Sequence, residues 1–203
     1  MNWQQFIREL FGLAEPYLKA RDDVLHTRVA HKFALDLLEK EAGDKKIVEP
    51  AVILHDVGWS QLKPEEIKVA FGVHAKGEKA KKLNRIHEVE GARIAREILT
   101  KLNFDCSSTD KIARIIERHD SGTNPRTIEE KLVKDADRLW RFSKIGYDHE
   151  MERQNTTHEI RYHFLIQNMG KWFFTKTAKE LADIELQKRV KEHSDLKTRK
   201  KKV

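Results

Sequence analysis

The sequence predicts an all-α protein folded as a helical bundle. Apolar residues recur at spacings of three and four over most of the chain, which is typical of amphipathic helices. Proline and glycine are scarce, with four and nine among 203 residues. No alternation of polar and apolar residues runs long enough to predict a strand. We find no repeat and no linker composition, so we expect a single domain over residues 1–203.

The N-terminal part is expected to hold two long helices and a short one. The first covers residues 3–19, and the second follows the Asp22–Asp23 pair, either member of which can cap it. Pro50 suits the first position of a short helix that Gly58 ends. Residues 59–84 are polar and lysine-rich, and we expect a mobile connection that contains a short helix.

Helical spacing resumes at residue 86 and continues toward the C-terminus. The expected helices cover residues 86–102, 109–119, 127–143, 155–173 and 175–193. We divide the domain into a core, a C-terminal helical extension and a basic disordered tail, at about 20–145, about 150–193 and 194–203.

The positive charge of the chain is concentrated at its C-terminus. The formal net charge is +7, and the segment from Lys188 to Val203 carries eight basic against two acidic residues. About one positive charge is therefore left for the whole body. Such a body does not favour nucleic-acid binding, which we expect, if at all, only through the tail.

Cysteine content and hydropathy exclude several further classes. The single cysteine, Cys106, rules out a disulfide framework and a thiolate metal cluster, and it fits a reducing compartment. There is no apolar run of 18 residues, and the N-terminus lacks the layout of a signal peptide. We therefore expect a cytoplasmic protein that does not interact with a membrane.

Six titratable side chains lie on apolar helix faces or within an apolar run. They are His26, His55, Asp56, His87, His119 and Asp137. A single buried histidine is most simply a satisfied core residue. However, we find no inward-facing Lys or Arg to pair with the buried acids, which would then be costly. One or two divalent ions would satisfy all six side chains, because imidazoles and carboxylates are natural ligands of such ions.

The remaining histidines lack this setting, and we interpret them as solvent-facing or structural. They are His31, His74, His149, His158, His163 and His193.

The order of these residues resembles the HD-domain superfamily of metal-dependent phosphohydrolases. His26 begins HTRVA, the His55–Asp56 doublet follows the apolar run AVIL and continues as HDVG, and Asp137 lies in DADRL. The resemblance covers about residues 20–145. It implies a helical bundle with a metal site at its centre.

Two further histidines extend the resemblance to the binuclear pattern H…HD…H…H…D. His87 begins HEVEGARIA, in which Gly91 would let a neighbouring backbone approach, and His119 precedes Asp120-Ser121-Gly122. The resemblance implies that two ions are held, with Asp56 bridging them. Asp120 could be an extra ligand or a helix-end residue, and we favour the helix-end reading.

The resemblance also implies the ligands of each ion. The first would be held by His26, His55, Asp56 and Asp137, and the second by His87 and His119. A ligand set of nitrogen and oxygen favours Mn, Fe, Co or Ni over structural Zn and is compatible with Mg. The implied reaction is attack of a metal-bound water on a nucleotide or another small phosphoester.

Cations near these motifs are candidate ligands of the substrate phosphate. They are Arg28, Lys134 and Arg138, and the alternative for each is a surface ion pair. The lysines at 76, 79, 81 and 82 could close over an anion as a lid, although a solvated loop is the simpler interpretation. Two other functions stay open, a di-iron oxygenase of the same superfamily and a metal-binding regulatory module without catalysis. The oligomeric state is not indicated.

Overall fold

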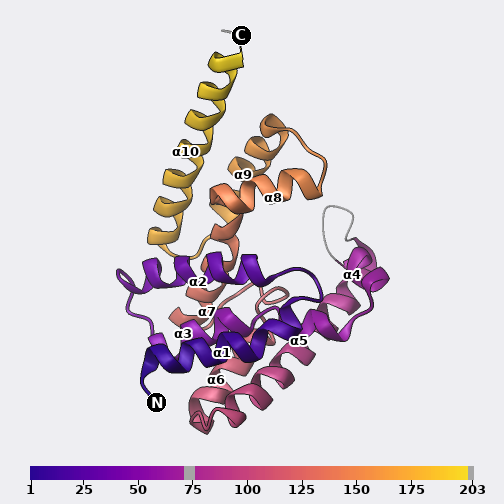
Figure 1. Ribbon diagram of the computed structural model, residues 1–203, viewed down its shortest axis with the longest axis vertical. Helices are drawn as coiled ribbons and strands as arrows, with labels where there is room; N and C mark the ends of the chain where they lie inside the picture. Colours follow the sequence, from indigo (N-terminus) through magenta and orange to yellow (C-terminus); the bar gives the residue numbers. More distant parts are fainter. Residues whose placement is uncertain (71–75, 201–203) are drawn as a thin grey trace.

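The computed structural model describes residues 1–70 and 76–200, with side chains up to Ser194, and this part of the chain contains helices but no strand. Figure 1 shows the arrangement. The helices are α1 (Trp3–Leu18), α2 (Val24–Leu38), α3 (Lys45–Leu54), η1 (Val57–Gln61), α4 (Pro64–Ala70), α5 (Gly77–Lys101), α6 (Cys106–Ile116), α7 (Ile128–Leu139), η2 (Trp140–Phe142), α8 (Lys144–Arg153), α9 (His158–Trp172) and α10 (Lys176–Lys200). The predicted all-α class is confirmed. None of the helices described is long and apolar enough to cross a bilayer.

Helix α3 lies at the centre of the bundle. All residues from Ile47 to Leu54 are buried, and the helix packs against α1, α2, α6 and α7. A helix surrounded in this way must be apolar on nearly every face, as the run AVIL at its end is. The same burial carries His55 and Asp56, which follow α3 directly, into the interior.

One carboxylate is buried within α3 itself. Glu49 accepts a hydrogen bond from Nε1 of Trp3 at 2.8 Å and lies 2.7 Å from Nε2 of His31. Burial opposes its ionisation, but the hydrogen bonds from His31 and Trp3 lower the pKa of Glu49 below its ordinary value. These contacts fasten α1 and α2 to α3, so His31 is structural, which is one of the two roles predicted for it.

The predicted start of α3 is wrong. Pro50 lies inside the helix, and the first helical residue is Lys45. The side chain of Asp44 accepts a hydrogen bond from the backbone N–H of Lys46 at 2.8 Å and caps the helix five residues earlier than expected.

The expected mobile connection is largely regular structure in its described residues. Residues 57–61 form η1 and residues 64–70 form α4, and α5 begins at Gly77 rather than at residue 86. A second apolar cluster holds these elements together and consists of Trp59, Leu62, Ile67, Ala70 and Leu83. The lysines at 79, 81 and 82 are exposed on the first turns of α5, and Lys76 occupies its N-cap position. Residues 71–75, with His74, lie outside the described residues.

The C-terminal part differs from the prediction in two ways. The segment expected as one helix over 155–173 is preceded by a separate helix, α8, and α9 itself spans His158–Trp172. Helix α10 extends away from the bundle (Figure 1) and continues to Lys200, whereas the sequence predicted a disordered tail from residue 194. No glycine or proline occurs after residue 176 that would end the helix earlier.

Asp135 fastens this C-terminal part to α7. Its buried carboxylate accepts hydrogen bonds from the backbone N–H groups of Phe174 and Thr175, both at 2.9 Å, and from Oγ1 of Thr175 at 2.7 Å. Thr175 Oγ1 in turn lies 3.2 Å from the backbone nitrogen of Ala178, in the first turn of α10. The start of α10 is therefore fixed relative to α7.

Two glycines allow η1 and α5 to meet backbone to backbone. A Cβ atom at Gly58 would lie 1.9 Å from the carbonyl oxygen of His87 and 2.5 Å from the backbone nitrogen of Gly91. A Cβ at Gly91 would itself meet the backbone nitrogen of Gly58 at 3.4 Å. The sequence predicted a close approach at Gly91, whereas the stricter requirement lies at Gly58.

We expect Gly58→Ala to lower the free energy of unfolding by about 2 kcal/mol or more, because the new methyl group overlaps rigid backbone atoms. Urea denaturation followed by circular dichroism measures the change. The matched control is Gly170→Ala in α9, where an added Cβ meets nothing within 4 Å. That variant should be neutral or up to about 1 kcal/mol more stable, because alanine favours helix. Equal stability of the two variants would contradict the expectation.

Candidate metal centre

The structure brings the six predicted residues together, and we refer to them as the His/Asp cluster. His26 lies in the first turn of α2, His55 and Asp56 follow α3, His87 lies within α5, His119 follows α6, and Asp137 lies in the last turn of α7. Five of them are at most 6% exposed, and Asp137 is 9% exposed. Residues up to 111 positions apart in sequence thus share one interior site.

One half of the cluster consists of His26, His55 and Asp137. The Nε2 atoms of His26 and His55 are 3.0 Å apart. Oδ1 of Asp137 lies 3.2 Å from Nε2 of His26 and 3.7 Å from Nε2 of His55. One ligand atom from each residue lies within 4.8 Å of the other two, which is compact enough for a single ion.

The other half consists of His87 and His119, with Asp120 at its exposed side. The Nε2 atoms of the two histidines are 3.4 Å apart, and Oδ2 of Asp120 lies 3.6 Å from Nε2 of His87. The reading of Asp120 as a helix-end residue is wrong, because α6 ends at Ile116 and the carboxylate is directed at the histidine pair.

Asp56 connects the two halves through its two oxygens. Oδ2 lies 3.4 Å from Nε2 of His26 and 3.2 Å from Nε2 of His55. Oδ1 lies 3.6 Å from Nε2 of His119. A carboxylate in this position can donate one oxygen to each of two ions.

The tautomers of two histidines expose lone pairs to the cluster. Nδ1 of His55 lies 2.7 Å from the carbonyl oxygen of Val52, and Nδ1 of His119 lies 2.8 Å from that of Ile116. A carbonyl can only accept, so each Nδ1 carries a proton, and Nε2 is the ring nitrogen whose lone pair can bind an ion when the ring is neutral. Bare nitrogens and carboxylate oxygens that face one another repel unless a cation or a proton lies between them. This donor set fits a divalent metal ion.

The protonation states of the cluster depend on burial and on charge. Burial opposes the charged form of His55, but the carboxylates of Asp56 and Asp137 raise its pKa well above the ordinary value. Burial would raise the pKa of Asp56, but Arg21 and His55 hold it well below its usual range. For His87, burial and the charge of His119 lower the pKa to about 3, so this ring is neutral.

Trp59 positions members of both halves. Its indole Nε1 donates a hydrogen bond to Oδ1 of Asp56 at 2.9 Å. Its ring stacks on His87, with centroids 3.9 Å apart and an angle of 11° between the planes. This role of Trp59 could not be predicted from the sequence, because the short 3-10 helix η1 shows no helical periodicity.

Two arginines pair with the buried aspartates, which the sequence analysis did not find. Nη2 of Arg21 lies 2.6 Å from Oδ2 of Asp56, and Nη1 of Arg141 lies 3.6 Å from Oδ2 of Asp137. The statement that no Lys or Arg pairs with these acids is therefore wrong. Arg21 lies in the turn before α2 and Arg141 in η2, where helical periodicity cannot indicate the direction of a side chain.

The three predicted phosphate ligands lie in other contacts. Arg28 is exposed, with its guanidinium 5.3 Å from the ring centroid of Phe11 on α1. Arg138 donates to the carbonyl oxygen of Trp172 and lies over the ring of Phe174. Neither side chain is directed at the His/Asp cluster.

Lys134 holds the segment that presents His119. It is 1% exposed, and its Nζ donates hydrogen bonds at 2.6 Å to the carbonyl oxygens of both Arg118 and His119. Burial, together with nearby Arg138, lowers its pKa. Its geometry indicates a positioning residue, and not a ligand of the substrate phosphate.

Glu88 fixes the same segment from α5. Its carboxylate is fully buried and accepts hydrogen bonds from the backbone N–H groups of Asp120 and Ser121, at 3.0 and 2.8 Å, and from Oγ of Ser121 at 2.7 Å. Because Glu88 adjoins His87, α5 supplies one histidine of the pair and the anchor of the other. The loop after α6 therefore has a defined conformation without being helical.

The fold and the site together define the class of this protein. It is an all-α bundle with a buried cluster of His and Asp side chains at its centre. The family model described as HD domain matches residues 24–141, which is more than half of the chain. This protein belongs to the HD-domain family. The match falls within the span of about 20–145 that the motifs indicated.

Two solved structures share this fold. A predicted HD superfamily hydrolase from an uncultured Thermotogales bacterium is 20% identical, with a TM-score of 0.66, and the similarity covers 98% of this chain and 99% of that one. Bacillus subtilis YpgQ is 20% identical, with a TM-score of 0.62 and coverage of 95% and 94%. Both similarities extend beyond the HD match to the C-terminal helices.

One curated relative is a tRNA (cytidine(56)-2'-O)-methyltransferase from Picrophilus torridus. It is 29% identical over an alignment of 143 residues, and the match covers 61% of this chain and 33% of the relative. This chain therefore spans about a third of the length of that protein.

We expect Trp59→Phe to weaken the binding of Mn²⁺ about tenfold or more, because the ring can still stack while the hydrogen bond to Asp56 is lost. Calorimetric titration of EDTA-treated protein measures the affinity. Trp172→Phe, at a half-buried tryptophan on α9, is the control and should bind Mn²⁺ as the wild type does. Unchanged affinity of the Trp59 variant would show that this hydrogen bond does not position Asp56.

Lys134→Met should lower the free energy of unfolding by about 2 kcal/mol or more, because two buried carbonyl oxygens lose a charged donor. Urea denaturation tests this. Lys131→Met, on the same helix but partly exposed, is the control and should change stability little. A Lys134 variant of normal stability would restore the phosphate-ligand interpretation.

Proposed function

We propose that this protein is a metal-dependent phosphohydrolase that acts on a nucleotide or another small phosphoester. The observation that carries the proposal is the convergence of His and Asp ligand atoms in two halves that share Asp56. The description of a structural neighbour as a hydrolase supports the reaction class. Methyl transfer is not proposed, because the side chains of the cluster are of the kinds that hold metal ions.

The residues that would hold the ions follow from the two halves of the cluster. His26, His55 and Asp137 would hold the first ion, and His87 and His119, with Asp120 as an added candidate, would hold the second. Asp56 would contribute one oxygen to each. Mn, Fe, Co or Ni suit this nitrogen and oxygen set better than Zn, and Mg is compatible with it. A divalent ion bound there would make water a better nucleophile and offset charge on the phosphoryl oxygens.

Arg21 and Arg141 are the cations best placed to orient the phosphate. Each guanidinium group already lies against a cluster carboxylate. Both line a cavity of about 50 Å³ beside His26. Arginine binds phosphate through paired N–H donors, so these two side chains replace Arg28, Lys134 and Arg138 as candidate phosphate ligands in this proposal.

The test is hydrolysis of a phosphoester panel by EDTA-treated protein to which Mn²⁺, Fe²⁺, Co²⁺, Ni²⁺ or Mg²⁺ is restored separately. We expect metal-dependent turnover that falls about 100-fold or more in Asp56→Asn, because loss of a shared carboxylate disturbs both ions. Asp148→Asn is the matched control, since Asp148 is exposed on α8, and it should retain full activity.

The outcomes separate the remaining functions. Restored hydrolysis that depends on Asp56 would establish the reaction and begin to identify the substrate. Folded protein that binds iron but hydrolyses no ester with any metal would reject the proposal in favour of oxygen chemistry or a binding role.

A further inference from the structure

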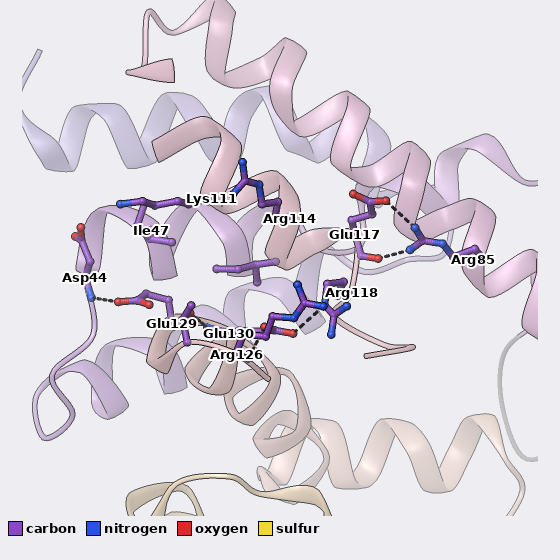
Figure 2. Close-up of a pocket in the computed structure, with 12 residues that line it drawn as sticks. Asp44, Ile47, Arg85, Lys111, Arg114, Glu117, Arg118, Arg126, Glu129 and Glu130 are labelled. Atoms are coloured by element: carbon purple, nitrogen blue, oxygen red, sulfur yellow. Dashed lines mark hydrogen bonds and ion pairs between the residues drawn. The ribbon is translucent and has the colours of Figure 1, made fainter. Parts of the chain in front are cut away.

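A second cavity, of about 590 Å³, lies outside the His/Asp cluster and is lined by residues of α3, α5, α6, α7 and their connections (Figure 2). None of the six cluster residues lines it. Its volume falls in the range of small-molecule sites, about 300–1,000 Å³. Ile47 and Ile115 provide apolar surface, while most other lining residues are charged.

Two of the carboxylates at this cavity are already engaged. Glu117 lies 2.6 Å from Nη2 of Arg85, in an ion pair that Figure 2 shows. Glu129 accepts a hydrogen bond from the backbone N–H of Asp44 at 3.2 Å. These acids therefore do not require a ligand.

The remaining two carboxylates are engaged as well. Glu130 accepts a hydrogen bond from the backbone N–H of Arg126 at 2.8 Å and lies 3.5 Å from Nε of Arg118. Asp44 caps α3 through the backbone N–H of Lys46. All four acids are thus neutralised or hydrogen-bonded within the protein.

Three cationic side chains at the cavity have no comparable hydrogen bond or ion pair among the residues described. Within the described part of the chain, the side chains of Lys111, Arg114 and Arg126 make no hydrogen bond or ion pair, and all three are exposed. Lys111 and Arg114 are three residues apart and so share a face of α6. Figure 2 shows them along one wall, with Arg126 beside Glu130 at the other.

We propose that this cavity binds a small phosphorylated ligand of about the size of a mononucleotide. Its phosphate oxygens contact Lys111, Arg114 and Arg126, and its apolar part lies against Ile47 and Ile115. Guanidinium and ammonium groups that make no internal hydrogen bond or close ion pair are suited to phosphate, because charge-assisted hydrogen bonds to its oxygens are stronger than neutral ones.

The cavity adjoins the segment that presents His119. Glu117 and Arg118 line the cavity and directly precede His119. Arg85 donates to both the carbonyl oxygen and the carboxylate of Glu117 and comes from α5, which also carries His87. A ligand at this wall therefore contacts the segment that presents His119. The binding step does not depend on the hydrolysis proposed above.

Calorimetric titration with inorganic tripolyphosphate tests the site, on full-length EDTA-treated protein at low ionic strength. We expect Lys111→Gln/Arg114→Gln to weaken binding about tenfold or more, because two charged donors are lost. The control is Arg8→Gln/Lys40→Gln, which removes the same charge at two exposed positions, Arg8 on α1 and Lys40 just after α2. It should keep the affinity within about twofold. All four side chains are exposed, so both proteins should fold, which circular dichroism verifies.

Several results would overturn the proposal. The first is that the wild type does not bind tripolyphosphate, and the second is that the two double variants bind it with equal affinity. The third is that Arg21→Gln weakens binding while Lys111→Gln/Arg114→Gln does not, because this result would place the anion at the His/Asp cluster. None of these results bears on hydrolysis, which the Asp56→Asn measurement tests separately.

Discussion

Burial of the His55–Asp56 pair at the end of α3 is the constraint on which the rest of the structure depends. Because α3 is enclosed by four helices, both side chains leave water, at a cost of several kcal/mol unless each polar atom finds a partner. Four partners come from distant parts of the chain and are Arg21, His26, His119 and Asp137, while Trp59 lies three residues after Asp56. The pair is satisfied only when the bundle is closed, so the fold and the site form together.

Close packing of η1 on α5 serves the same pair. The stacking of Trp59 on His87 requires the two backbones to meet where Gly58 lies against the His87 carbonyl. Trp59 is then directed at Asp56. A packing requirement and a positioning requirement thus coincide in the sequence HDVGW, which explains why a glycine and a tryptophan follow the doublet.

The sequence could predict the six cluster residues because most of them lie on or next to helices, whose period gives each side chain a direction. It could not predict the contact of Arg21 with Asp56. Arg21 lies in the turn before α2, which contains Asp22 at a φ of 62° and has no helical period. The start of α3 was misplaced because Pro50 was assigned to the first turn, whereas the cap at Asp44 lies earlier. Glu88 and Lys134 were not recognised as anchors, because their partners are backbone groups of a loop 15 to 33 residues away.

The two halves of the cluster are held by different means. His26, His55 and Asp137 lie in or beside helices that pack directly on one another, so core packing fixes their spacing. His119 and Asp120 lie beyond the end of α6 and are fixed by hydrogen bonds instead: Lys134 donates to the carbonyl oxygen of His119, and Glu88 accepts from the backbone N–H of Asp120. A few polar contacts are more easily shifted than a packed core. Adjustment of the centre is therefore expected at His119, the residue next to Glu117 and Arg118, and Asp56 would transmit it to the other half.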